Sequence, residues 1–210
     1  MVRIAMRSMV VLALLAGRAQ AGEDGEPRGG FFEAAGGMML PLGDDDYENV
    51  IDPSFKLGFH GGSWLGKIGI EGAVDWSTMS EDLDGMVLGQ SFDTDVNRFR
   101  VQLGVRAGTR VGKSKQALVF ARFLAGIDIS HVSVTTVVLG TESSSSDSDT
   151  GLALEAGMGV LVDVGGVAVG GQVAVPFAFH DQTDNNPNDG YDPDYAGYDL
   201  DLLFTVSSTF

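Results

Sequence analysis

The last thirteen residues of the chain alternate between apolar and polar side chains. Every second residue counted back from Phe210 is apolar with one exception, and most of the residues between them are polar. This period of two is that of a β-strand with one apolar face. Its length suits a tilted strand that crosses a membrane, which needs about 9–11 residues. The apolar parity of this segment comprises Tyr198, Leu200, Leu202, Phe204, Val206, Ser208 and Phe210.

Seven earlier segments show the same alternation, which brings the number of expected strands to eight. A closed up-and-down barrel in a bacterial outer membrane has an even number of antiparallel strands. The fold class that the sequence predicts is therefore all-β: an eight-stranded antiparallel transmembrane β-barrel. The expected strands cover residues 32–40, 55–60, 68–76, 98–107, 119–129, 152–162, 167–179 and 198–210.

The links between the expected strands alternate between short and long. Outer-membrane barrels show this pattern, with short periplasmic turns and long external loops. The long links hold 18 of the 29 Asp and Glu residues and no Lys or Arg. The serine run 143–146 has low complexity, and we expect it to be mobile. The short links are residues 64–67, 109–115 and 163–166, and the long links are residues 41–53, 78–96, 132–150 and 180–197.

Charged residues within the expected strands all fall on the parity opposite to the apolar one. A charge on the lipid face near the membrane midplane costs about 2–4 kcal/mol, so we expect these residues to face the lumen and to pair there. Side chains just fill the interior of eight strands, which leaves a rigid scaffold or a narrow gated channel rather than an open pore. A soluble β-sandwich would also bury one parity, so the sorting alone does not establish membrane insertion. The expected lumen charge cluster comprises Glu33, Lys56, Glu71, Asp75, Arg98, Arg100, Arg106, Arg122, Asp128 and Glu155, and Asp199 and Asp201 share its parity.

The first 21 residues have the pattern of a secretory signal peptide. Arg3 and Arg7 precede a short apolar run over residues 9–16, and small residues follow at a cleavage site that ends at Ala21. The apolar run is well short of the about 20 residues that a membrane helix needs, although an uncleaved anchor is the alternative. The expected domains are a signal peptide over residues 1–21, a linker over residues 22–29 and a barrel over residues 30–210.

Charge and cysteine content exclude several function classes. Cleavage would remove three of the 13 basic residues and none of the 29 acidic ones, which leaves a net charge of −19 (10 − 29). Nucleic acid is therefore excluded as a partner, because contacts with phosphate need Lys and Arg. The chain has no cysteine, which excludes disulfides and thiol chemistry. We expect no cofactor.

Residues 30–210 resemble the small eight-stranded outer-membrane β-barrel family, which includes opacity-type and OmpA-like transmembrane domains. The similarity lies in the opening segment 31–43 and in the amphipathic last strand that ends on Phe210. The resemblance implies a bacterial outer-membrane protein that contacts membrane lipid and lipopolysaccharide. It also implies that Phe210 is an assembly signal read by the barrel-assembly machinery. Ser208 departs from the family, which usually has a large apolar residue at that position.

The expected role is structural or surface-interacting, without enzymatic activity, and its working surface is the set of acidic external loops. Divalent cations are candidate partners of these loops. In the fourth long link, Asp184, Asn186, Asn188 and Asp189 offer the hard oxygen ligands that Ca²⁺ prefers. The turn glycine of a calcium loop comes one residue late here, and no Glu closes the loop. A specific metal site is therefore not expected.

Two other functions are compatible with the same pattern. His131 and Ser133 continue the lipid-facing parity and resemble the His-x-Ser pair of outer-membrane lipid A deacylases, with Glu142 as the nearest downstream acid. In that family an Asn follows the Ser, whereas Val134 stands at this position. The second alternative is a soluble periplasmic β-barrel that binds a small apolar ligand.

Overall fold

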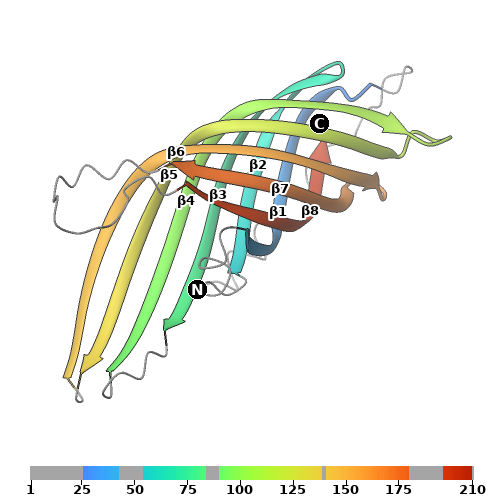
Figure 1. Ribbon diagram of the computed structural model, residues 1–210. Coiled ribbons are helices and arrows are strands. Elements are labelled where there is room, and N and C mark those ends of the chain that lie inside the picture. The colour runs from blue at the N-terminus through green and yellow to red at the C-terminus, as the bar shows by residue number, and fades with distance from the viewer. Residues whose placement is uncertain (1–25, 43–53, 84–89, 139–140, 180–195, 210) are drawn as a thin grey trace.

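Eight antiparallel strands close into one barrel in which each strand pairs with its neighbours in the chain and β1 pairs with β8 (Figure 1). The computed structural model describes residues 26–42, 54–83, 90–138, 141–179 and 196–209. The predicted fold class is confirmed. The strands are β1 (Gly29–Leu42), β2 (Ser54–Leu65), β3 (Ile68–Leu83), β4 (Gln90–Val111), β5 (Ala117–Val138), β6 (Thr141–Asp163), β7 (Ala168–Phe179) and β8 (Ala196–Thr209).

The outer surface of the barrel wall is apolar, and the charged side chains of the wall lie on its inner surface. Leu103 and Phe204 are 70% and 61% exposed, whereas the inward-facing Lys56 and Glu155 are completely buried. A soluble barrel carries its polar side chains outside, because a large exposed apolar surface is unfavourable in water. This arrangement is the reverse, and it argues against the soluble ligand-binding alternative. Among the described residues, no helix is long and apolar enough to cross a membrane.

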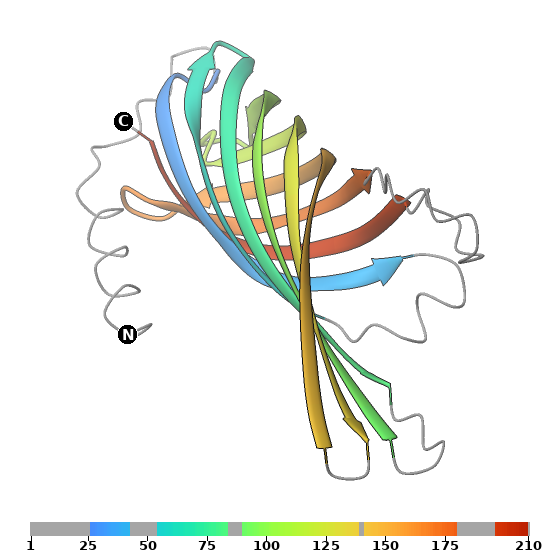
Figure 2. The same cartoon turned by 90° about the vertical axis from the view of Figure 1, so that its left-hand side faces the viewer.

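Four strands continue past the ends of their neighbours as a curved sheet (Figure 2). β4, β5 and β6 have 22, 22 and 23 residues, whereas β7 has 12. The last pair between β6 and β7 is Leu152 with Phe179, so β6 extends about eleven residues further. We call this extension the projecting sheet. It comprises residues 79–83, 90–97, 130–138 and 141–151.

The projecting sheet corrects the expected third long loop. Ser143–Ser146 was expected to be mobile, but these residues lie in β6 and pair with Ser133–Thr136 of β5. The β-branched side chains of β5, including Val132 and Val134, favour an extended backbone. The serines need supply only backbone hydrogen bonds, which do not depend on side-chain character. The prediction of a mobile loop, which rested on composition alone, was therefore wrong for these residues.

The polarity of the two sheet faces reverses where the projecting sheet begins. On the outer face, the apolar row of Trp76, Phe99 and Ile129 is followed two residues further on by Thr78, Asn97 and His131. On the inner face, charged rows give way to Met79, Val96 and Val132, which lie on neighbouring strands. The apolar belt therefore ends at the level of Trp76.

Two glycines permit a close approach between β4 and β5. A Cβ atom at Gly126 would lie 2.0 Å from the carbonyl oxygen of Val101, and one at Gly104 would lie 2.0 Å from that of Phe123. Real side chains do not tolerate such a distance. The close approach of the two strands at these positions therefore requires both residues to lack a side chain.

We expect the Gly126→Ala variant to lose about 1–3 kcal/mol of unfolding free energy, because the new methyl group must push β4 and β5 apart. Urea unfolding in detergent micelles measures this loss. Gly36→Ala is the matched control, since its Cβ would meet nothing closer than the Leu57 Cδ1 atom at 3.7 Å. Equal urea midpoints for the two variants would show that the close approach is wrong.

Candidate functional site

The lumen contains a network of buried charges. All ten residues of the expected lumen charge cluster lie there, as do Asp199 and Asp201. Seven carboxylates face five Lys and Arg side chains and one histidine, His60, within the described part of the chain. Each group comes from an alternating inward position of its strand, so the parity of the sequence places them together.

Arg106 is the centre of the network near the short turns. Its guanidinium donates to both carboxylate oxygens of Glu33, with distances of 2.6 and 2.7 Å, and to both of Glu71, with distances of 2.7 and 2.8 Å. The same group lies 4.6 Å from the ring centroid of Phe31 and 4.2 Å from that of Phe120. Arg106 therefore joins β1, β3 and β4 and connects the charged layer to an aromatic one.

Lys56 and Arg122 extend the network through the middle of the lumen. The Lys56 ammonium donates to Asp201 at 2.6 Å and to Glu155 at 3.0 Å. Arg122 donates to the other oxygen of Glu155 at 2.5 Å. Glu155 therefore bridges β2 and β5, and Lys56 bridges β6 and β8. The two contacts of Lys56 connect strands that are not adjacent in the barrel wall, whereas Arg122 and Glu155 lie on the neighbouring strands β5 and β6.

Two arginines of β4 occupy the lumen closest to the projecting sheet. Arg98 donates to Asp128 at 2.5 and 3.1 Å and to Asp199 at 3.3 Å. Within the part of the chain that the structure describes, Arg100 makes only longer ion pairs, at 3.6 Å to Asp128 and 3.8 Å to Asp199. Arg98 and Arg100, at successive inward positions of β4, therefore contact the same two carboxylates, and Arg98 does so at shorter distances.

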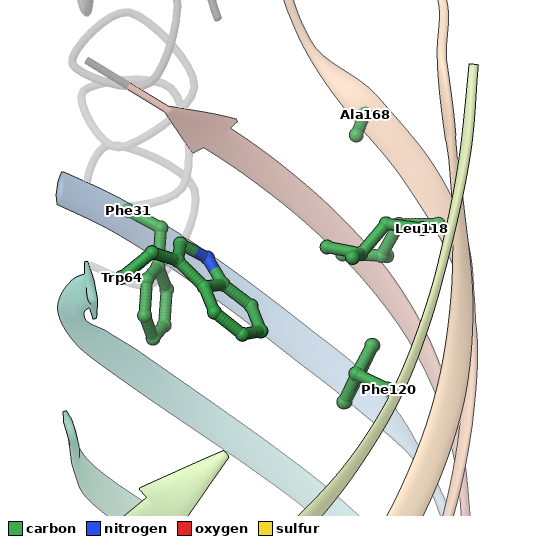
Figure 3. Packing of buried hydrophobic residues seen from close by; sticks show 6 residues of the cluster. Phe31, Trp64, Leu118, Phe120 and Ala168 are labelled. Atoms are coloured by element: carbon green, nitrogen blue, oxygen red, sulfur yellow. The ribbon is translucent and has the colours of Figure 1, made fainter. Parts of the chain in front are cut away.

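A cluster of buried apolar side chains lies inside the barrel near the short turns (Figure 3). Its residues lie near the ends of five strands that meet the short turns. The ring centroids of Phe31 and Trp64 are 5.8 Å apart. Together with the charged network, this cluster places buried side chains in the interior of the barrel, as expected for eight strands. Parity counting missed it, because these residues lie on the parity assigned to polar groups. The cluster comprises Phe31, Trp64, Leu118, Phe120, Leu161 and Ala168.

The structure does not assemble the lipid A hydrolase candidate. His131 and Ser133 lie on the outer face of the projecting sheet, and the His131 Nδ1 atom is 2.8 Å from the hydroxyl of Ser148. Glu142 pairs with Val137, six residues beyond His131, which places it about 20 Å away along the strand. A triad needs its acid within hydrogen-bond reach of the histidine, so Glu142 cannot orient His131.

Two sets of expected residues fall outside the described part of the chain. They are the calcium candidates Asp184, Asn186, Asn188 and Asp189, and the assembly signal Phe210. Both stay predictions. Within the described residues, no group of three or more His, Cys, Asp or Glu side chains is arranged to hold a metal ion.

Comparison with known proteins relates the chain to solved outer-membrane barrels. No family model and no curated protein matches it. The attachment invasion locus protein Ail of Yersinia pestis is 15% identical, with a TM-score of 0.50 over 87% of this chain and 99% of that one. The Neisserial surface protein A is 10% identical, with a TM-score of 0.48 over 86% and 97%. The chain therefore shares the fold of small eight-stranded outer-membrane β-barrels.

The N-terminal β-barrel domain of Pseudomonas aeruginosa OprF is a third solved structure of this kind. It is 13% identical, with a TM-score of 0.44 over 87% of this chain and 98% of that domain. All three likenesses concern the fold alone.

We expect Arg106→Leu to lower the unfolding free energy by about 3–5 kcal/mol, because it leaves the carboxylates of Glu33 and Glu71 buried without their cation. Urea unfolding in micelles measures the change. Arg106→Lys keeps the charge but loses the bidentate geometry, so its unfolding free energy should lie between that of the wild type and that of Arg106→Leu. The exposed Lys113→Gln serves as the control and should change the stability by less than about 0.5 kcal/mol. A stability of Arg106→Leu equal to that of the control would contradict the central role of Arg106.

Proposed function

We propose that this protein is an integral outer-membrane β-barrel that displays the projecting sheet and its acidic loops at the cell surface, in a structural or surface-interaction role. The observation that carries the proposal is the division of the barrel wall. Its outward residues are apolar and exposed, and its charged residues face a filled lumen. Lipid is the solvent in which that division is favourable.

The end of the apolar belt supports the location of the membrane surface. From Trp76 and Phe99 toward the short turns, the outer face is apolar. From these two residues toward the projecting sheet, it carries His131, Ser148 and the exposed Asp95. Side chains of this second kind are costly in hydrocarbon and favourable in the headgroup region or in water. We therefore place the projecting sheet outside the bilayer, where Asp95 lies at the level of lipopolysaccharide phosphates and divalent cations can bridge the two.

The filled lumen favours a scaffold over a channel. The apolar cluster around Phe31 and Trp64 lies across one end, and Arg106 with its two carboxylates lies directly above it. Ions crossing the barrel would have to displace both layers. Rigidity of this kind suits a protein whose role is to hold an external surface in a fixed orientation.

The projecting sheet supports an interaction role. Residues 141–151 of β6 pair with β5 on one side and with no described strand on the other. An open strand edge can take up an extended segment of another protein. Two of its backbone N–H groups are already used, because Ser148 and Thr150 donate to the carboxylates of Asp147 and Asp149. The part available for pairing is therefore the tip, at residues 141–147.

Membrane insertion is tested by fractionation. We expect the mature protein to sediment with outer membranes, to resist extraction by carbonate, and to migrate faster on a detergent gel before boiling than after it. These results reflect a closed barrel whose apolar belt needs lipid or detergent. Recovery of a folded protein in the soluble fraction without detergent would refute the proposal.

Orientation is tested by labelling, because the chain has no cysteine of its own. Ser145→Cys places a thiol on the exposed tip of β6, and Ser114→Cys places one on the exposed turn between β4 and β5. We expect a membrane-impermeant maleimide to label the first variant in whole cells and the second only after lysis. The reverse pattern would mean that the projecting sheet faces the periplasm.

A further inference from the structure

The basic residues of the mature chain divide into two equal groups. Ten of the 13 Lys and Arg residues lie after residue 21, and none follows Arg122. Five of the ten are buried in the lumen network described above. The other five lie at the short-turn end of the barrel, so the surface charge of that end differs from that of the acidic opposite end. This group, which we call the basic turn patch, comprises Arg28, Lys67, Arg110, Lys113 and Lys115.

Backbone contacts hold the turns of the basic turn patch side by side. The N–H of Gly108 in β4 donates to the carbonyl oxygen of Lys67 at 2.8 Å, which joins the β2–β3 turn to the β4–β5 hairpin. Arg110 donates to the carbonyl oxygen of Lys115 at 3.3 Å across the next turn and forms an ion pair with Asp163. The pairing of Gly29 with Trp64 brings the start of β1 beside the same turns. The turns that carry the patch therefore lie at the same end of the barrel, although the side chain of Arg110 is only 5% exposed.

Two lysines of the basic turn patch are directed to the outside. Lys67 and Lys113 are exposed, and neither forms an ion pair with a residue that the structure describes. By contrast, the charge of Arg110 is offset by Asp163. Lys67 and Lys113 are thus the members best placed to bind an anion from the surroundings.

The neighbours of these lysines are large apolar side chains that face outward. Leu65 and Ile68 on either side of the Gly66–Lys67 turn are 69% and 58% exposed, and Val111 precedes Gly112 and Lys113 with 40% exposure. An ammonium group beside exposed aliphatic side chains suits the boundary between acyl chains and headgroups, where a lysine stem lies in hydrocarbon and its charge reaches the phosphates. A dissolved polyanion would gain nothing from these aliphatic groups.

We propose that the basic turn patch binds the phosphate groups of anionic phospholipids in the inner leaflet of the outer membrane, with Lys67 and Lys113 as its main ligands. This inference rests on the proposed membrane location and adds a ligand to it. Lipids with one or two anionic phosphates, such as phosphatidylglycerol and cardiolipin, suit two exposed lysines at the same end of the barrel, whereas a zwitterionic lipid has an amine that opposes them. Bound lipid of this kind fixes the depth of the short turns in the bilayer.

The test is native mass spectrometry of the folded barrel released from micelles that contain equal amounts of cardiolipin and phosphatidylethanolamine. We expect the wild-type protein to retain cardiolipin in preference, and Lys67→Gln/Lys113→Gln to retain it about tenfold less well. Ser144→Glu/Ser146→Glu is the matched control, because it lowers the net charge by the same two units on the exposed tip of β6. This control should retain cardiolipin as the wild type does.

Three outcomes would overturn the inference: equal retention of the two lipids, equal retention by the lysine variant and the control, or loss of cardiolipin to an equal concentration of inorganic phosphate. The last would identify a site for free anions only. The cysteine labelling separates this failure from failure of the proposed function. A protein that inserts with the expected orientation and shows no lipid preference refutes the lipid site alone.

Discussion

The narrowness of the lumen is the constraint on which the rest of the structure depends. Eight strands leave a space that side chains fill, so a charge that points inward meets another side chain rather than bulk water. Arg106 shows the result, since its guanidinium contacts two carboxylates and lies against two aromatic rings. Each inward charge is tolerable only because a partner of opposite sign on another strand, neighbouring or distant, reaches it. The network therefore determines which strands must come together as well as what fills the barrel.

The same constraint explains why the strand pattern of the sequence was so informative. When one face of every strand meets apolar surroundings and the other meets packed charges, a period of two must persist along the whole strand. The eight strands, their closure and their short turns followed from that period. Lys56 and Glu155 could be placed in the lumen from parity alone, although 99 residues separate them.

Parity could not predict features that depend on position along the barrel axis. It specifies the face on which a residue lies but not its depth, so Phe31 and Leu118 could not be recognised as a closed end. Nor could it specify partners, because Lys56 reaches Asp201 on a strand that is not its neighbour. The extension of β5 and β6 was missed for a different reason. Backbone pairing stabilises Ser143–Ser146 there, whereas their side chains indicated a loop.

The carboxylates of Asp147 and Asp149 have a consequence for how copies of the protein behave when they are crowded in one plane. Barrels that diffuse in a membrane collide repeatedly with their strand edges parallel, and open edges tend to join into shared sheets. Because the N–H groups of Ser148 and Thr150 are already bonded within their own chain, the part of the β6 extension next to the barrel wall offers few donors to a neighbour. In the proposed membrane location, this arrangement disfavours lateral clustering through that part of the edge, whereas the tip of β6 keeps free N–H donors for a partner.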